Sequence, residues 1–388
     1  MKPLFSTVVA VTLSFVASSS AQVPTPIRTE AMDLPSKHAW DIFVAMSWPA
    51  LDPVKTGKRG VPDTSKPLGA PGSVTVWETW REATPEVFLP TGAKPPADYN
   101  DMSLVTSCPG GKVPEPAASH QVAGFIELQA PGRIVPEFNP VEGIAPVGTF
   151  GFGETRVNKA TYDFILQNEL WNVPTQVKYA KAFIGRTKPA LSFPPESIAA
   201  KAAWVEMTDE QIKSGKDKTF YLVNFNGKEY GLASLHITTK DMPNWFWINF
   251  HHKDIPGSGY ENGDPNAKPA IVKGTIWDNY VLGGTQTDFI TTTGDPTLLS
   301  DSYIEADFRR SSCISCHVKA SRNDTDGKGT GTGATPDIGP PSPSLYEDIA
   351  GNLKVLQFDF LYSLQVRAQK DNTNAKFDDP CKVSSNAQ

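Results

Sequence analysis

Proline and glycine occur along the whole chain at a density that keeps every regular element short. The 388 residues include 34 prolines and 30 glycines. Proline removes a backbone donor and breaks helices, and glycine lowers helix stability. We therefore expect short helices, many turns and much irregular backbone. Hydrophobic residues make up 39% of the chain, which is enough for a packed core and excludes a wholly disordered protein.

The first 21 residues have the pattern of a secretory signal peptide. Lys2 supplies a positive charge, residues 4–16 are mostly apolar, and Ser19-Ser20-Ala21 is a small-residue cleavage site. We expect cleavage after Ala21 and a periplasmic or secreted protein. No later stretch reaches the roughly 18 apolar residues that a membrane helix needs, so we expect no membrane span.

A C-x-x-C-H motif occupies Cys313-Ile314-Ser315-Cys316-His317. Two cysteines three residues apart lie on one helical turn, where both thiols can form thioether bonds with the vinyl groups of one porphyrin. The residue that follows, His317, is then placed to give an axial nitrogen to the iron. The motif therefore predicts one covalently attached haem c, with Cys313 and Cys316 as the attachment points. Such attachment takes place outside the cytoplasm, in agreement with the leader.

Other interpretations of the motif remain open. A redox pair of the thioredoxin type needs a buried strand before it, whereas Arg309-Arg310-Ser311-Ser312 is polar. A zinc site needs a second pair of ligands with suitable spacing. A disulfide between Cys313 and Cys316 would be small and strained.

Cys108 and Cys381 are the remaining cysteines. In an oxidising compartment two leftover thiols usually pair, so Cys108 and Cys381 are candidates for a disulfide. The sequence alone does not fix their connectivity.

The pattern along the chain predicts an α+β fold with a β-rich antiparallel body. Helices are expected at 36–48 and 158–171, with Asn158 as N-cap, and Asn226-Gly227 is a hairpin turn. Helical structure is also expected at 298–320 and 353–367. The strand-like segments are Ala199–Met207, Phe220–Phe225, Tyr230–Thr238 and Asn244–His251.

These elements suggest a division of the chain. Residues 1–21 form the leader, 22–195 a helix- and loop-rich part, 196–297 the sheet, and 298–388 the haem attachment segment with a final helix. Residues 22–388 can also form one compact unit.

The second axial ligand is not a downstream methionine. The methionines are at 1, 32, 46, 102, 207 and 242, and none follows His317, which excludes the arrangement of a small cytochrome c domain. The upstream candidates are His252, His236 and His251. Alternation along the last strand puts His252 on the face of Phe246, Ile248 and Phe250, and His251 on the face of the tryptophans. Each candidate can also be an ordinary core histidine.

Several stretches resemble a group of secreted bacterial cytochrome c family proteins that carry one haem. The matching residues are Met46–Ala50, Val76–Trp80, Tyr230–Ile237, Pro243–His252, Leu282–Gln286 and Ile304–Glu305, followed by the motif itself. The resemblance is patchy but spans most of the chain. It implies a periplasmic protein with a single haem, with His236 and His252 as matching histidines, and it implies no particular reaction.

Two functions follow from these observations. The first is electron transfer, with a redox protein or a small oxidisable molecule as partner. Arg309, Arg310, Lys319 and Arg322 then form a docking rim or an ordinary solvated surface. The second is a haem enzyme of the peroxidase or oxygenase type, in which His252 or His236 acts as an acid–base group beside an open iron face. A net charge of −6 argues against a nucleic-acid partner.

Overall fold

The computed structural model describes residues 22–89, 94–102, 151–225, 228–255, 257–301, 310–330 and 338–368. The predicted leader, Cys108, Cys381 and the Asn226-Gly227 turn lie outside these residues. Within them the chain has a mixed α/β architecture with one large antiparallel sheet and short helices, as the α+β prediction expects.

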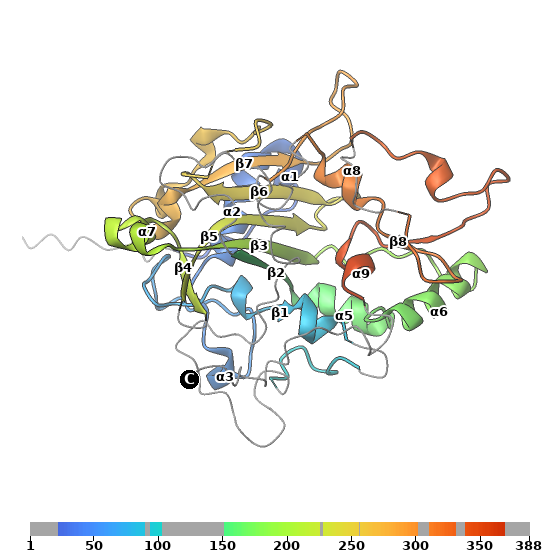
Figure 1. Cartoon of the computed structure of the whole chain (residues 1–388), viewed down its shortest axis with the longest axis horizontal. Coiled ribbons are helices and arrows are strands. Elements are labelled where there is room, and N and C mark those ends of the chain that lie inside the picture. The colour runs from blue at the N-terminus through green and yellow to red at the C-terminus, as the bar shows by residue number, and fades with distance from the viewer. Residues whose placement is uncertain are drawn as a thin grey trace, which may run out of the picture.

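The sheet is the centre of the molecule (Figure 1). Its seven strands run in the order β1-β2-β3-β5-β6-β7, and β4 pairs with one end of β5. Every pairing between named strands is antiparallel. The strands are β1 (Arg81–Glu82), β2 (Gly151–Val157), β3 (Ile198–Glu206), β4 (Leu222–Phe225), β5 (Lys228–Thr239), β6 (Phe246–His252) and β7 (Tyr280–Gln286), with a separate pair β8 (Ser321–Arg322) and β9 (Leu356–Gln357).

The helices are short, and a polar cap or a proline marks the start of α2, α3, α5, α6, α7 and α8. Asn158 accepts the backbone N–H of Thr161 at the start of α5, as the sequence predicts, and Asn172 caps α6 in the same way through Thr175. The α-helices are α1 (Glu30–Asp33), α2 (Pro35–Met46), α3 (Pro53–Thr56), α5 (Lys159–Gln167), α6 (Val173–Ile184), α7 (Asp209–Ser214), α8 (Cys313–His317) and α9 (Ser363–Val366). Single turns are η1 (Trp77–Thr79), the π-turn η2 (Ala83–Val87), η3 (Lys216–Thr219), η4 (Pro265–Ala267), η5 (Ala270–Val272), η6 (Ile276–Asn279) and η7 (Pro343–Leu345).

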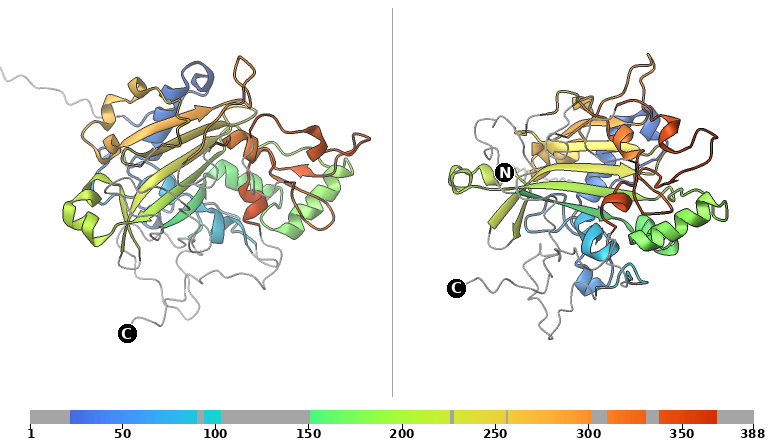
Figure 2. Two further views of the ribbon diagram at one scale, coloured as in Figure 1. Left: turned by 45° about the horizontal axis from the view of Figure 1, so that its top comes forward. Right: turned by 45° about the vertical axis from the view of Figure 1, so that its right-hand side comes forward.

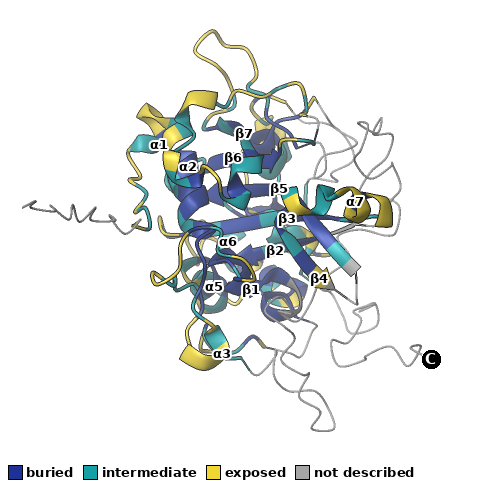
Figure 3. Cartoon of the chain, turned by 90° about the vertical axis from the view of Figure 1, so that its left-hand side faces the viewer, coloured by how far each residue is buried: buried dark blue, intermediate teal, exposed yellow. Residues whose placement is uncertain are grey.

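Two hydrophobic cores lie on opposite faces of the sheet. One core contains residues of α2 together with Phe246, Ile248 and Phe250, which alternate along β6. The other contains Trp247 from the opposite face of β6, together with α8 and the segment around α9. The central strands are largely buried, whereas α1, α3 and α7 carry exposed residues (Figure 3). In β6, Phe246, Ile248 and Phe250 belong to one core and Trp247 to the other, which confirms the alternation predicted for this strand.

The C-terminal segment covers one end of the strands. In both views of Figure 2 the orange and red segment lies beside the green helices α5 and α6. Leu356 and Leu364 of this segment share a core with Trp247 and with Ile165 of α5. The predicted haem segment therefore packs directly on the sheet.

Both predicted C-terminal helices are wrong in their extent. Among the described residues of 298–320, which are 298–301 and 310–320, only Cys313–His317 is helical, and Leu299 instead forms a parallel bridge with Ser312. Of 353–367, only Ser363–Val366 is helical. The apolar stripe of that segment is interrupted because Asp359 and Phe360 have positive φ angles of 45° and 68°, which no right-handed helix accepts.

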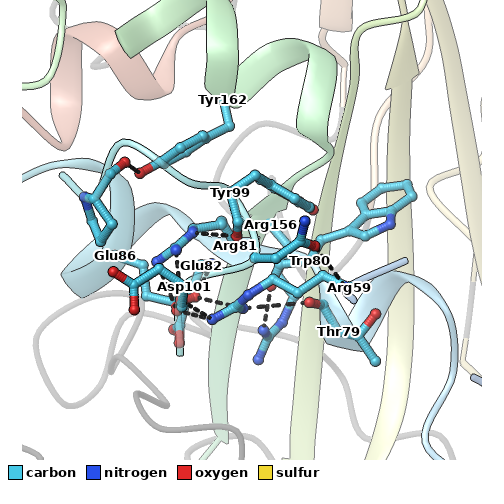
Figure 4. Close-up of polar contacts among 12 residues, drawn as sticks. Arg59, Thr79, Trp80, Arg81, Glu82, Glu86, Tyr99, Asp101, Arg156 and Tyr162 are labelled. Carbon is cyan, nitrogen blue, oxygen red and sulfur yellow. Dashed lines mark hydrogen bonds and ion pairs between the residues drawn. The ribbon is translucent and has the colours of Figure 1, made fainter. Parts of the chain in front are cut away.

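A buried ionic network attaches β1 and the 94–102 loop to the molecule (Figure 4). Glu86 receives Arg59 at 2.6 Å and Arg81 at 3.4 Å between nitrogen and oxygen. Arg81 also donates to the carbonyl oxygens of Tyr99 at 3.0 Å and Asp101 at 2.6 Å. These bonds satisfy charges that would otherwise be costly to bury.

Glu82 is the exception in this network. Arg156 is paired with Glu154 at 2.7 Å, but neither carboxylate oxygen of Glu82 has a hydrogen-bond partner in the described part of the chain. Burial raises the pKa of Glu82 well above its usual value, and the Arg156 charge opposes that rise. Glu82 is therefore held as the protonated acid over a wider pH range than an exposed glutamate.

Candidate redox site

The helix that carries the C-x-x-C-H motif begins at a capped and tethered N-terminus. Ser312 caps α8, and its hydroxyl receives Nε2 of Gln286 at 2.7 Å. The Oε1 atom of the same Gln286 side chain accepts the backbone N–H of Ile314 at 3.1 Å. Because Gln286 is the last residue of β7, the start of the motif helix is fixed to the edge of the sheet.

The two motif cysteines are on one turn of α8, as their spacing predicts. The thiol of Cys313 is buried and donates to the carbonyl of Leu299 over 3.2 Å. Cys316 is partly exposed. The thiol pair therefore lies at the boundary between core and surface.

His317 is held in one orientation by contacts on several sides. Its Nδ1 lies 2.9 Å from the carbonyl oxygen of Phe360. Its ring meets the ring of Trp247 edge-on with centres 4.5 Å apart, and the ring of Tyr362 lies at 5.7 Å. A bond from Nδ1–H to the Phe360 carbonyl leaves the lone pair on Nε2, which makes Nε2 available as a ligand atom.

His236 is the histidine that faces His317. It comes from β5, where it pairs with Lys201 on β3 and with Asn249 on β6. The centres of the His236 and His317 rings are 6.3 Å apart, with the ring planes at 50°. His236 is buried, and its Nε2 has no hydrogen-bond partner among the described residues. Such an atom is rare in a folded protein and calls for a partner of its own.

Both facing imidazoles are kept neutral. Burial lowers the pKa of His317 to about 4, partly opposed by its bond to the Phe360 carbonyl. Burial lowers the pKa of His236 well below its usual value, and the neighbouring His317 and Lys201 lower it further. Metal binding by histidine requires the neutral ring, so both side chains are in the protonation state of nitrogen ligands at neutral pH.

His252 and His251 lie elsewhere. His252 is on the opposite face of β6, where its Nε2 lies 2.9 Å from the carbonyl oxygen of Thr219 and its ring stacks on Phe220 at 3.6 Å. His251 shares a face with Trp247, but its Nδ1 lies 3.0 Å from the carbonyl oxygen of His252. The geometry therefore favours His236 over the other two sequence candidates as the neighbour of His317.

Of the basic residues predicted to form a docking rim, Arg322 does not lie on the surface. Arg322 is buried, and its guanidinium binds Gln176 at 2.8 Å and the carbonyl oxygens of Leu364 and Gln365 at 3.1 and 2.9 Å. Arg322 is thus a structural residue and belongs to no docking surface. Arg310 is exposed and Lys319 partly exposed, and Arg309 lies outside the described residues.

Comparisons with known proteins do not add to this geometry: no protein-family model, no curated protein and no solved structure matches the chain. Across the described ranges, no helix is both long and apolar enough to cross a bilayer. The same ranges contain no group of three or more His, Cys, Asp and Glu side chains gathered as ligands for a metal ion.

Sequence reasoning missed several residues that position the site. Gln286 was part of the resembling stretches without a role of its own. The carbonyl of Phe360 has no signature in a sequence, because any residue could supply it. The Phe360 carbonyl also lies next to Asp359, whose ion pair with Lys240 joins two residues that are far apart in the chain and become neighbours only through the fold.

Proposed function

We propose that this chain is a periplasmic or secreted c-type haem redox protein that carries one covalently bound haem and transfers electrons. The observation that carries the proposal is the pair of neutral, facing imidazoles, His236 and His317, one of which has an unpartnered buried nitrogen. The resemblance to secreted bacterial cytochrome c family proteins with one haem agrees with this proposal.

The residues fit an iron held between two imidazoles. A nitrogen ligand lies about 2 Å from its metal and about 1.1 Å from its own ring centre, so two axial imidazoles have centres about 6 Å apart. His236 and His317 have a ring separation of 6.3 Å. The unpartnered Nε2 of His236 gains a partner in this arrangement.

Each residue of the site has a distinct role in the proposal. Cys313 and Cys316 would hold the porphyrin through their sulfur atoms, and His317 and His236 would supply the nitrogen ligands of the iron. The haem, when bound, supplies a one-electron couple whose potential depends on its ligands and their hydrogen bonds. The Phe360 carbonyl fixes the orientation and tautomer of His317. The buried ring of Trp247 packs against both histidines, with its centre 6.1 Å from that of His236 and 4.5 Å from that of His317.

The proposed partner is a redox protein or a small oxidisable molecule. Electron transfer needs close approach of the partner to the site but no substrate pocket beside the iron. Cys316 and His317 are partly exposed, and Arg310 is exposed a few residues before them. This side of α8 is the proposed point of approach.

A haem enzyme of the peroxidase or oxygenase type is the second candidate. Such an enzyme needs an open iron face with room for a reactant between the iron and an acid–base group. The short separation of the His236 and His317 rings leaves no such room. Electron transfer is therefore favoured over catalysis.

The test is maturation of the chain in a host that attaches haem c. The purified protein should gain the mass of one haem, keep it under denaturing conditions, and show a six-coordinate low-spin spectrum that carbon monoxide and cyanide do not alter. The variant Cys313→Ser/Cys316→Ser should lose covalent attachment. A colourless wild-type protein with the mass of its polypeptide refutes the proposal. A high-spin spectrum that shifts with those ligands favours the enzyme.

A further inference from the structure

The carbonyl that orients His317 belongs to a strained turn. Leu361 N–H bonds to the carbonyl of Phe358 at 2.9 Å, which closes a four-residue turn. Its two central residues, Asp359 and Phe360, have φ angles of 45° and 68°. Glycine and asparagine are the usual residues of such turns, and a phenylalanine adopts this region only at an energetic cost. Surrounding contacts must hold the turn in this conformation.

A buried ion pair holds the turn. Lys240, just after β5, places its Nζ 2.6 Å from Oδ1 of Asp359, and both side chains are less than one-tenth exposed. The other carboxylate oxygen of Asp359 accepts the backbone N–H of Phe193 at 2.7 Å. Lys240 Nζ also donates to the carbonyl oxygen of Pro243 at 2.7 Å. The turn is thus attached to the end of the same strand that carries His236.

A continuous series of bonds therefore connects the sheet to the Nδ1 of His317. It runs from Lys240 to the carboxylate of Asp359, through one peptide unit to Phe360, and from the Phe360 carbonyl to His317 over 2.9 Å. Without the carboxylate, the backbone at Asp359 and Phe360 can relax to negative φ, which turns the Phe360 carbonyl away from the imidazole.

We propose that Lys240 and Asp359 are positioning residues that tune the iron site through the Phe360 carbonyl. This inference rests on the proposed function. A carbonyl acceptor on Nδ1–H makes the opposite nitrogen of a ligating histidine more basic. A more basic ligand stabilises the oxidised iron more than the reduced iron. The ion pair thus keeps the reduction potential lower than it would be with a relaxed turn.

The test compares three variants of the haem-loaded protein. Asp359→Ala removes the carboxylate with its bonds to Lys240 and Phe193 and disfavours positive φ at this position. Lys240→Met breaks the ion pair from the other side. Asp254→Asn is the control, because it removes a different ion pair, Lys216–Asp254 at 2.5 Å. Lys216 comes shortly after α7, which lies at the opposite end of the sheet from α8 (Figure 1). Potential, electron paramagnetic resonance spectrum and thermal stability are measured for each.

The expected result is a more positive potential in both Asp359→Ala and Lys240→Met, with the low-spin spectrum kept and its g values changed. We expect the equilibrium constant for reduction to change about tenfold. This change corresponds to a shift of about 59 mV in the potential of a one-electron couple. Asp254→Asn should keep the wild-type potential. If both variants lose stability but keep the wild-type potential and g values, the pair is merely structural and the inference is overturned. Wild-type protein without covalent haem would refute the proposed function itself.

Discussion

The unpartnered Nε2 of His236 lies on β5 in front of His317 of α8, with the two ring centres 6.3 Å apart. The facing pair joins the middle of the sheet to the C-terminal segment. Replacement of His236 is therefore the substitution that distinguishes ligation by His236 from ligation by His251 or His252.

Replacement of His236 by alanine should convert the haem-loaded protein from low-spin to high-spin, because the iron would lose one of its two proposed axial imidazoles. The variant should then bind carbon monoxide, and added imidazole should restore the low-spin spectrum. Visible spectroscopy measures all three effects. His252→Ala is the matched control and should leave the spectrum unchanged, since His252 lies on the other face of β6. A spectral change in the control alone would assign the ligand to His252.

Gln286→Ala should destabilise the attachment segment. The substitution leaves the buried Ile314 N–H without its partner, which costs about 1–3 kcal/mol. It also removes the bond from Gln286 to the Ser312 hydroxyl, which keeps its bonds with Ser315. Chemical denaturation should show a lower free energy of unfolding, and the yield of covalent haem should fall. Asn262→Ala is the control, because Asn262 forms a similar pair of bonds with Thr285 at an exposed position. Equal losses in the two variants would contradict the role assigned to Gln286.

Stability should fall on acidification because of His252. Burial lowers the pKa of His252 to about 4, from a usual value of 6.5. Below pH 6.5 the imidazole of His252 is protonated in the unfolded chain but stays neutral in the folded protein. The free energy of unfolding therefore falls between pH 6.5 and about 4, and His252 causes no further change below that pH. The total is about 3 kcal/mol for a shift of this size. Denaturation at a series of pH values should show a shallower slope for His252→Gln; an identical slope would exclude His252 as the source.

Glu82→Gln should raise the free energy of unfolding at neutral pH by about 1–3 kcal/mol. Burial raises the folded-state pKa of Glu82 above its usual value of 4.5. Above pH 4.5 the carboxyl group ionises in the unfolded chain while it stays protonated in the folded protein, so the free energy of unfolding falls as the pH rises toward the folded-state pKa. Glutamine does not ionise, so the variant avoids this fall. Glu86→Gln, in the same network, should have the opposite sign and cost about 3–5 kcal/mol, because Arg59 and Arg81 then lack their carboxylate. Denaturation curves at pH 5 and 7.5 would reveal the contrast, and a destabilised Glu82→Gln would refute it.

Local signals in the sequence predicted the elements whose ends they mark. Pro35 and Pro49 bracket α2, Asn158 caps α5, and alternation along β6 assigned its two faces. These signals act within a few residues of the feature that they specify. The antiparallel sheet followed from them.

Long-range contacts decided the elements that were predicted wrongly or missed. Leu356 belongs to an apolar stripe of helical spacing, yet it pairs with Arg322 in β9 and β8. Strand β7 contains Gly283 and Gly284, which have low strand propensity, and it is held by pairing with β6. Tertiary context overrides local propensity at such positions.

The candidate site also has one part that local sequence signals predicted and one part that depends on long-range contacts. The motif is contiguous, so its spacing predicted the arrangement of Cys313, Cys316 and His317 on one helical turn. The partner of His317 was not predicted with any preference for His236, because alternation gives the face of a residue but not its neighbours across the fold.

The sheet separates the core around α2 from the core around the motif helix. Substitutions on the two sides share few contacts, so their effects on stability should add. The side that holds α2 can therefore be redesigned, tagged or joined to another protein with little effect on the opposite side, where the proposed redox site lies. The sheet would thus let the protein be attached to a surface or a partner without altering that site.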